Sequence, residues 1–257
     1  MEVQAPTNAA GAAMVTIPAG EYRIGSARFY PEEAPSRLVT LAAFQIAQTP
    51  VTNAQFAAFV AASGYRTVSE LPPDPALYPG LSREQRQPAS VVFRPLPSSV
   101  DRANPIDWWA LVPGANWRHP QGPASGIDGL EQHPLVHIAW ADALAYCAWS
   151  GLRLPTAREC EVAALAQFLL LADSVWGLVD NDYSWGNELN PQGQWMANTW
   201  QGVFPWENLT ADGWFWTSPV GHSPLPLPRQ GRDLQHLPTA ANLLALELIR
   251  SIGEKPR

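Results

Sequence analysis

The sequence predicts an α+β domain in which a few helices and short strands are joined by much irregular backbone. Two capping-box patterns, Thr52 with Gln55 and Thr156 with Glu159, each open a run of apolar residues at helical spacing. Short apolar runs near the N-terminus are broken by Gly and Pro, which is typical of strands and turns. Residues 65–221 are dense in Trp, Gly and Pro, so long ordered loops are expected there.

The composition indicates a packed globular protein, and it lacks the features typical of nucleic-acid-binding and membrane proteins. The 257 residues suffice for one large domain or two small ones, and 46% of them are apolar against 15% charged. A net charge of −7 and the absence of any basic run argue against binding to nucleic acid. No run of ~18 apolar residues is present to span a bilayer. Residues 1–13 lack the two regions of a secretory signal, so we expect a disordered lead-in and a cytoplasmic protein.

The first half is expected to hold a hairpin, a strand, a helix and a long loop region. Residues 14–25 alternate short apolar runs with Gly and Pro, which predicts a β-hairpin, and residues 38–46 predict a further strand. A helix is expected over 53–63, ending at Gly64. Residues 71–129 show little periodicity but carry tryptophans that need a packed environment, so an ordered loop region is expected.

Helical spacing returns in the second half. A helix over 139–150 is predicted by its apolar positions, and a second helix follows Thr156. The two helix predictions depend on apolar residues at helical spacing, which are Trp140, Leu144, Cys147 and Ala148 for the first and Val162, Leu165 and Phe168 for the second. Turns are expected to dominate 183–221, and helical spacing reappears over 239–250.

The chain has two cysteines, Cys147 and Cys160, which match neither a zinc-ligand spacing nor a C-x-x-C redox pair. Because free cysteine is among the most buried residue types, both are expected to be small apolar residues inside helices. A single disulfide between them is the alternative.

Four segments carry a pattern that is specific when they are taken in order. They are Thr49-Pro50-Val51-Thr52-Asn53-Ala54-Gln55-Phe56; His133-Pro134-Leu135-Val136-His137 leading to Gly151-Leu152-Arg153-Leu154-Pro155-Thr156; Tyr183-Ser184-Trp185-Gly186-Asn187; and Met196-Ala197-Asn198-Thr199-Trp200 with Asp212-Gly213. Together they resemble the formylglycine-generating enzyme family, also called sulfatase-modifying factors. The resemblance covers about residues 14–221, and Trp117-Arg118-His119-Pro120 also fits it.

This resemblance implies a C-type-lectin-like fold, rich in irregular loops. It implies an enzyme that oxidises a cysteine of a sulfatase to formylglycine, using oxygen, a copper ion and a pair of its own cysteines near the C-terminus. It also implies a structural calcium ion. Relatives on the fold include sulfoxide synthases, inactive paralogues and ligand-display proteins, so the fold does not by itself settle function.

The resemblance stops after Gly221, and the last 41 residues contain no Phe, Trp or Tyr. We interpret this as a frameshift or an early stop, with a genuinely divergent tail as the alternative. The expected organisation is a lead-in over 1–13, a domain incomplete at its C-terminus over 14–221 and a divergent tail over 222–257. The motif with the family's reactive cysteines is missing, so no catalytic or cofactor-binding residue is assigned and the copper site is expected to be absent.

The calcium ligands implied by the resemblance are Asn198, Thr199, Asp212 and Trp214. Asn198 and Asp212 would supply side-chain oxygens, and Thr199 and Trp214 backbone carbonyls, which suits a hard cation. The alternative is an Asx-turn at Asn198 and a solvated Asp212.

Three histidines could be proposed as a metal triad: His119, His133 and His137. The segment that joins the last two contains Pro134 and is expected to be a strand, on which residues four apart share a face. It lacks the helix and the Glu of a zinc-protease pair, so ordinary hydrogen-bonded histidines are expected.

Two functions are therefore carried forward. In the first, the chain is a fragment of an oxidase that acts on a sulfatase, and it is inactive as it stands. In the second, it is a non-catalytic binding or scaffold protein on the same fold. The reading frame beyond codon 221 would discriminate between them, and neither the sulfatase nor the oligomeric state can be predicted.

Overall fold

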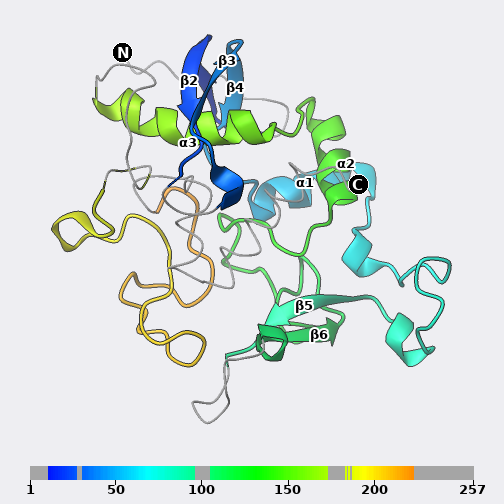
Figure 1. The fold of residues 1–257 in the computed structure, drawn as a ribbon. Coiled ribbons are helices and arrows are strands. Elements are labelled where there is room, and N and C mark those ends of the chain that lie inside the picture. The colour runs from blue at the N-terminus through cyan, green and yellow to red at the C-terminus, as the bar shows by residue number, and fades with distance from the viewer. Residues whose placement is uncertain are drawn as a thin grey trace.

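The computed structural model describes residues 11–27, 31–95, 105–172, 183, 185 and 187–222. Within these residues, three antiparallel strand pairs and three α-helices are joined by turns and short 3-10 segments, in agreement with the α+β prediction (Figure 1). The strands are β1 (Met14–Ile17), β2 (Gly20–Ile24), β3 (Arg37–Leu41), β4 (Phe44–Ala47), β5 (Ala89–Phe93) and β6 (Trp109–Pro113). The helices are α1 (Asn53–Ser63), α2 (Trp140–Ser150) and α3 (Ala157–Ala172).

The first four strands form one long two-stranded ribbon. β1 pairs with β4 and β2 pairs with β3, and the register is the same on both sides of the interruption. The hairpin predicted within residues 14–25 is therefore wrong. The tight turns that favour hairpins need positive φ, and Gly20 is not among the residues that have it. The strand predicted over residues 38–46 is present, but it is divided between β3 and β4.

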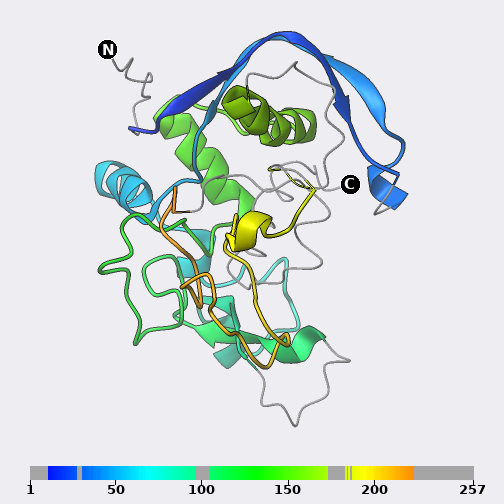
Figure 2. The same ribbon diagram turned by 90° about the vertical axis from the view of Figure 1, so that its left-hand side faces the viewer.

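The ribbon curves over α3, as Figure 2 shows. Their contact is an apolar cluster formed by Ile17, Tyr22, Ile24, Val39, Val162 and Ala163. At the end of β2, Gly25 has a φ of 79°, and its N–H donates to Oε1 of Glu161 on α3 at 2.6 Å. A Cβ at Gly25 would lie 2.6 Å from the carbonyl oxygen of Glu33. Glycine is therefore required where the ribbon meets the helix.

α1 and α2 begin and end where local chemistry predicts. Thr52 Oγ1 accepts the N–H of Gln55, and Gln55 Oε1 accepts the N–H of Thr52, which completes the predicted capping box. Both helices end at a left-handed glycine, Gly64 after α1 and Gly151 after α2. The helices predicted over residues 53–63 and 139–150 are thereby confirmed.

α1 and α2 pack through aromatic rings in a second cluster. Its buried members are Phe56, Phe59, Val60, Trp117, Leu135 and Tyr146. Phe56 lies edge-on to Trp117 with ring centroids 5.2 Å apart, a favourable arrangement of two aromatic rings. The expectation that tryptophans fill the interior of a loop-rich fold is met here.

The third strand pair was missed. β5 pairs with β6, and the ordered loop expected over residues 71–129 is to that extent wrong. The two strands are well separated in sequence, so no short turn signals the hairpin. The inner side of this pair belongs to a third cluster, formed by Phe93 and Trp200 with Trp108, Trp109, Phe204 and Trp216. Its outer side carries Val91 opposite Leu111, and both are exposed.

Several predictions concern residues outside those described. They are most of the lead-in, the helix over 239–250 and the divergent tail from residue 223 onward. Among the described residues, no helix combines the length and apolar character needed to cross a membrane.

The start of α3 holds an ion pair that makes stability depend on pH. Arg153 contacts both carboxylate oxygens of Glu159, at 2.8 and 2.5 Å, and Glu159 also accepts the N–H of Thr156. The hydrogen bonds from Arg153 are the main reason that the pKa of Glu159 falls to about 2. A carboxyl with a depressed pKa stabilises the fold above its unfolded pKa, and this contribution is lost as pH falls.

We expect Glu159→Gln to lower the free energy of unfolding by about 1–2 kcal/mol at neutral pH, since Arg153 is largely exposed and solvent weakens the pair. The difference from the unmodified chain should shrink as pH falls from about 4.5 toward 2, because both proteins then lack the charge. Denaturant unfolding over a pH series measures this, with the exposed Glu207→Gln as control. A difference that stays constant down to pH 2 would contradict the prediction.

Candidate functional site

A loop docked on the start of α1 organises the centre of the molecule. The backbone N–H groups of Asn53 and Ala54 donate to the carbonyls of His133 and Glu131, both at 3.0 Å. These N–H groups belong to the first turn of a helix, where no partner within the helix is available. The side-chain amide of Asn53 donates to the carbonyl of Leu130 at 2.9 Å. Loop 130–135 thus supplies hydrogen-bond acceptors for N–H groups in the first turn of α1.

The same loop holds the last described segment. His133 Nδ1 lies 2.8 Å from Thr217 Oγ1, and the N–H of Val220 donates to the carbonyl of Gln132 at 2.8 Å. These two hydrogen bonds hold residues 217–220 beside loop 130–135.

The four residues that the resemblance assigns to calcium lie on two adjoining loops. The Asp212 carboxylate accepts the backbone N–H groups of Thr199 and Trp214, each at 3.0 Å. The side-chain amide of Asn198 donates to the carbonyl of Trp216 at 2.8 Å. Asn198 therefore bonds across the two loops, and Asp212 is half-buried.

The donor chemistry of this group fits a hard cation. Its candidate ligands are oxygens, and each Asp212 oxygen that accepts one N–H retains further lone-pair capacity. Four protein oxygens fall short of the 6–8 that calcium takes, so water would have to complete the shell. The carbonyl of Thr199 also accepts a hydrogen bond from the Gln201 amide, which a cation would share or displace.

The three histidines do not form a metal site. The segment from His133 to His137 is not a strand, because His137 has a φ of 59° and Pro134 makes an isolated bridge with Thr52. The strand prediction for this segment is wrong. Among the described residues, no group of three or more His, Cys, Asp or Glu side chains could hold a metal ion. The expectation of ordinary hydrogen-bonded histidines is confirmed. His119 bonds to the Ser125 carbonyl, His133 bonds to Thr217, and both ring nitrogens of His137 have partners.

His137 is held as a neutral ring. Its Nε2 lies 2.8 Å from the Pro120 carbonyl, which can only accept, so Nε2 carries the proton. Burial is the main effect on His137 and lowers its pKa, which favours the neutral ring. In that state Nδ1 accepts from the Ser90 hydroxyl, 2.8 Å away.

The two cysteines are free and lie on separate helices, Cys147 on α2 and Cys160 on α3. Cys147 is buried and Cys160 is partly exposed, so the expectation of full burial holds for Cys147. Burial raises the pKa of both thiols, that of Cys160 to about 11. Suppression of the thiolate makes them poor ligands for a soft metal. These residues do not fit the copper centre that the resemblance implies for the family.

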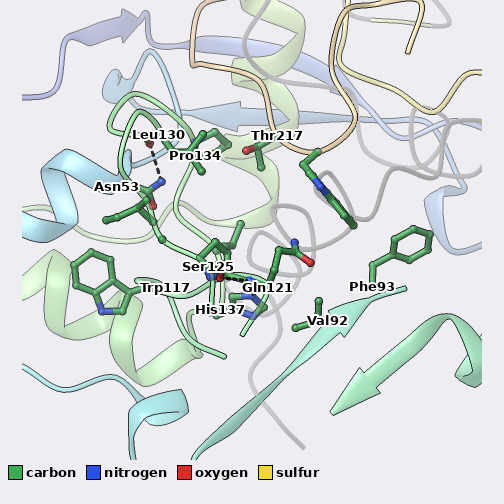
Figure 3. A pocket seen from close by; sticks show the side chains of 15 residues that line it. Asn53, Val92, Phe93, Trp117, Gln121, Ser125, Leu130, Pro134, His137 and Thr217 are labelled. Carbon is green, nitrogen blue, oxygen red and sulfur yellow. Dashed lines mark hydrogen bonds between the residues drawn. The ribbon is translucent and has the colours of Figure 1, made fainter. Parts of the chain in front are cut away.

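A cavity of about 130 Å³ lies beside the docked loop (Figure 3). Asn53 and Trp117 lie on one side of it in this view, and Val92 and Phe93 of β5 lie on the other. Sequence reasoning treated Asn53 as a helix position and Trp117 as core. Asn is a weak helix former. Its position directly after the N-cap was the available signal that its side chain has another role.

Comparison with known proteins decides the family. The sequence profile of the Sulfatase-modifying factor enzyme 1-like domain matches residues 2–226. The chain belongs to this family. The formylglycine-generating enzyme of Mycobacterium tuberculosis is 49% identical over 211 residues, covering 82% of this chain and 67% of the relative. That of Streptomyces coelicolor is 39% identical, with 86% and 69% covered.

Further relatives of similar identity include an enzyme from an animal and a protein whose name marks it as inactive. The formylglycine-generating enzyme of Mus musculus is 40% identical, covering 82% of this chain and 52% of the relative. The inactive C-alpha-formylglycine-generating enzyme 2 of Bos taurus is 38% identical, covering 82% and 64%. Across these relatives the chain spans about half to two thirds of their length. The solved structure of PvdO from Pseudomonas aeruginosa aligns with a TM-score of 0.44 at 18% identity, over 85% of this chain and 65% of that one.

We expect both thiols of the native chain to react slowly with a thiol reagent at pH 8. A pKa of about 11 in place of 9.0 lowers the thiolate fraction of Cys160 about a hundredfold, and Cys147 is also shielded by burial. Labelling of the native and the denatured chain, with Cys147→Ser and Cys160→Ser to identify each site, measures this. Labelling of either native thiol as fast as free cysteine would contradict it.

Proposed function

We propose that this chain carries the scaffold of a formylglycine-generating enzyme, on a C-type-lectin-like fold, for a cysteine-bearing segment of a sulfatase. The observation that carries the proposal is the family match over residues 2–226, together with 49% identity to a formylglycine-generating enzyme. The mixed architecture with few helices and long irregular connections is consistent with it.

The 257-residue chain is proposed to be non-catalytic as it stands. Oxidation of a cysteine at a copper ion would need accessible thiolates as soft ligands. The two cysteines of the chain have raised pKa values, and they lie on helices that pack into separate apolar clusters. No step is therefore assigned to either thiol.

A non-catalytic binding or scaffold role on the same fold is the second candidate. The observation that favours it is the 38% identity to a bovine relative whose name marks it as inactive. The reading frame beyond codon 221 distinguishes the two roles. If another frame encodes the family's missing C-terminal motif, the first role is supported, and if no frame does, this second role is supported.

Calcium is proposed as a structural ion held by Asn198, Thr199, Asp212 and Trp214. The support is the convergence of these residues on adjoining loops, where Asp212 already joins Thr199 to Trp214. When bound, the cation would offset the charge of Asp212 and tie the two loops together.

Calcium should raise the melting temperature of the chain relative to a chelator. Saturation at 100 times the Kd stabilises the native state by about 2.7 kcal/mol, or roughly 5–10 °C for a domain of this size. Asp212→Asn should abolish the difference, because an amide is a weaker ligand of similar shape, whereas Asp128→Asn at an exposed site should retain it. Identical melts of the unmodified chain with calcium and with chelator would refute the site.

The purified chain, given copper, oxygen and a sulfatase-type cysteine peptide, should yield no aldehyde by mass spectrometry. The physical reason is the low thiolate content of both cysteines. The M. tuberculosis relative, 49% identical, serves as the comparison enzyme. Turnover that is lost in Cys147→Ser or Cys160→Ser would overturn the proposal that the chain is non-catalytic.

A further inference from the structure

The side chain of Gln121 lines the cavity beside loop 130–135 and has no hydrogen-bond partner in the described part of the chain. Its backbone is held on both sides, since the N–H donates to Ser125 Oγ at 2.9 Å and the carbonyl accepts from Arg94 at 3.4 Å. Figure 3 shows the side-chain amide extending into the middle of the lining residues. Gln121 is half-buried, and both amide atoms keep accessible surface, so a ligand in the cavity can reach them.

The amide of Gln121 sets the polar group that a ligand needs. It offers an N–H donor and a carbonyl acceptor on neighbouring atoms. A group that pairs with both at once has its own N–H and C=O on the same side. The amide of a small ring has this arrangement, whereas an open-chain secondary amide is trans and directs the two groups to opposite sides. A cyclic amide is therefore the complement of Gln121.

The surroundings of the amide define the charge of a ligand. The lining residues include no Asp, Glu, Lys or Arg. The one histidine among them, His137, has both ring nitrogens hydrogen-bonded to the protein. An ion that bound here would give up hydration without gaining a counter-charge from the lining, which is costly. The cavity therefore favours a neutral molecule.

The size and the walls of the cavity limit the ligand to one ring. An apolar cavity of about 150 Å³ accepts benzene, and this one is about 130 Å³. A ring that carried a separate amide substituent would need more room than this, so the amide has to be part of the ring. Val92, Phe93 and Trp216 belong to the lining, which is mostly apolar, and Figure 3 shows Phe93 on the side toward which the Gln121 amide extends.

We propose that this cavity binds a neutral cyclic amide of a single ring. The ring N–H donates to Gln121 Oε1, and Gln121 Nε2 donates to the ring carbonyl. The apolar side of the ring packs against the walls of the cavity. Because the backbone of Gln121 is already fixed, the ligand has only one flexible side chain to order. The proposal does not depend on the sulfatase-modifying role.

The test titrates the full chain with 2-piperidone, a six-membered cyclic amide, and follows the ¹⁵N-labelled side-chain amide resonances. The Gln121 resonance is identified by its loss in Gln121→Met, and 2-piperidone should shift it. Cyclohexanone has the same ring and carbonyl but no N–H, so it can form only one of the two hydrogen bonds. It should therefore bind roughly three- to tenfold more weakly than 2-piperidone.

The variants separate recognition from packing. Gln121→Met keeps a side chain of similar length but removes both hydrogen bonds, so the preference for 2-piperidone over cyclohexanone should disappear. The methyl resonances of Val92 and Val136, which line the cavity, report binding in every variant. Gln87→Met, at an exposed glutamine outside the lining, is the matched control and should keep the preference.

Two results would overturn the proposal. The first is that 2-piperidone binds the unmodified chain no more tightly than cyclohexanone or leaves the Gln121 resonance unshifted. The second is that Gln121→Met retains the preference, since the ring would then be recognised by other groups. The first comparison needs no variant, so it holds even if Gln121→Met does not fold.

Discussion

The docking of loop 130–135 on the first turn of α1 is the contact on which the rest of the structure depends. A helix begins with N–H groups that its own turns cannot satisfy, and here the carbonyls of Glu131 and His133 satisfy two of them. The exchange runs in both directions, because Leu135 donates its N–H to the carbonyl of Val51. A segment with no regular structure of its own thereby acquires a fixed place, as buried backbone requires.

Both candidate sites follow from that placement. His133 and Gln132 anchor the segment that contains Thr217 and Val220. Thr217 in this segment lines the cavity. The segment follows the loop that contains Asp212, and the carbonyl of Trp216 accepts a hydrogen bond from the Asn198 side chain. In a fold with short strand pairs and three apolar clusters, hydrogen bonds between loops do much of the positioning that a large sheet would otherwise provide.

The parts of the fold that local chemistry determines could be predicted from the sequence. The limits of α1 and α2 follow from Thr52 and Gln55 and from the glycines at 64 and 151, which act within a few residues of themselves. The pairing of β5 with β6 could not be predicted, since it joins segments separated by a long connection. The positive φ of His137 could not be predicted either, because the partners of its ring, Ser90 and Pro120, belong to other segments of the chain. The candidate calcium residues were found through the resemblance, because the bonds that join them run between two loops. The role of Asn53 in holding loop 130–135 emerged from the three-dimensional arrangement.

The outer side of the β5–β6 pair has a consequence for handling the protein. Val91 and Leu111 face each other across the strands and are 42% and 66% exposed. Within the described residues, each of these strands also has one edge without a neighbouring strand. An apolar face beside open backbone edges is a template for strand addition between molecules. Self-association at high concentration should therefore begin at this end of the molecule, and a lysine at position 111 would oppose it without entering the aromatic cluster on the inner side.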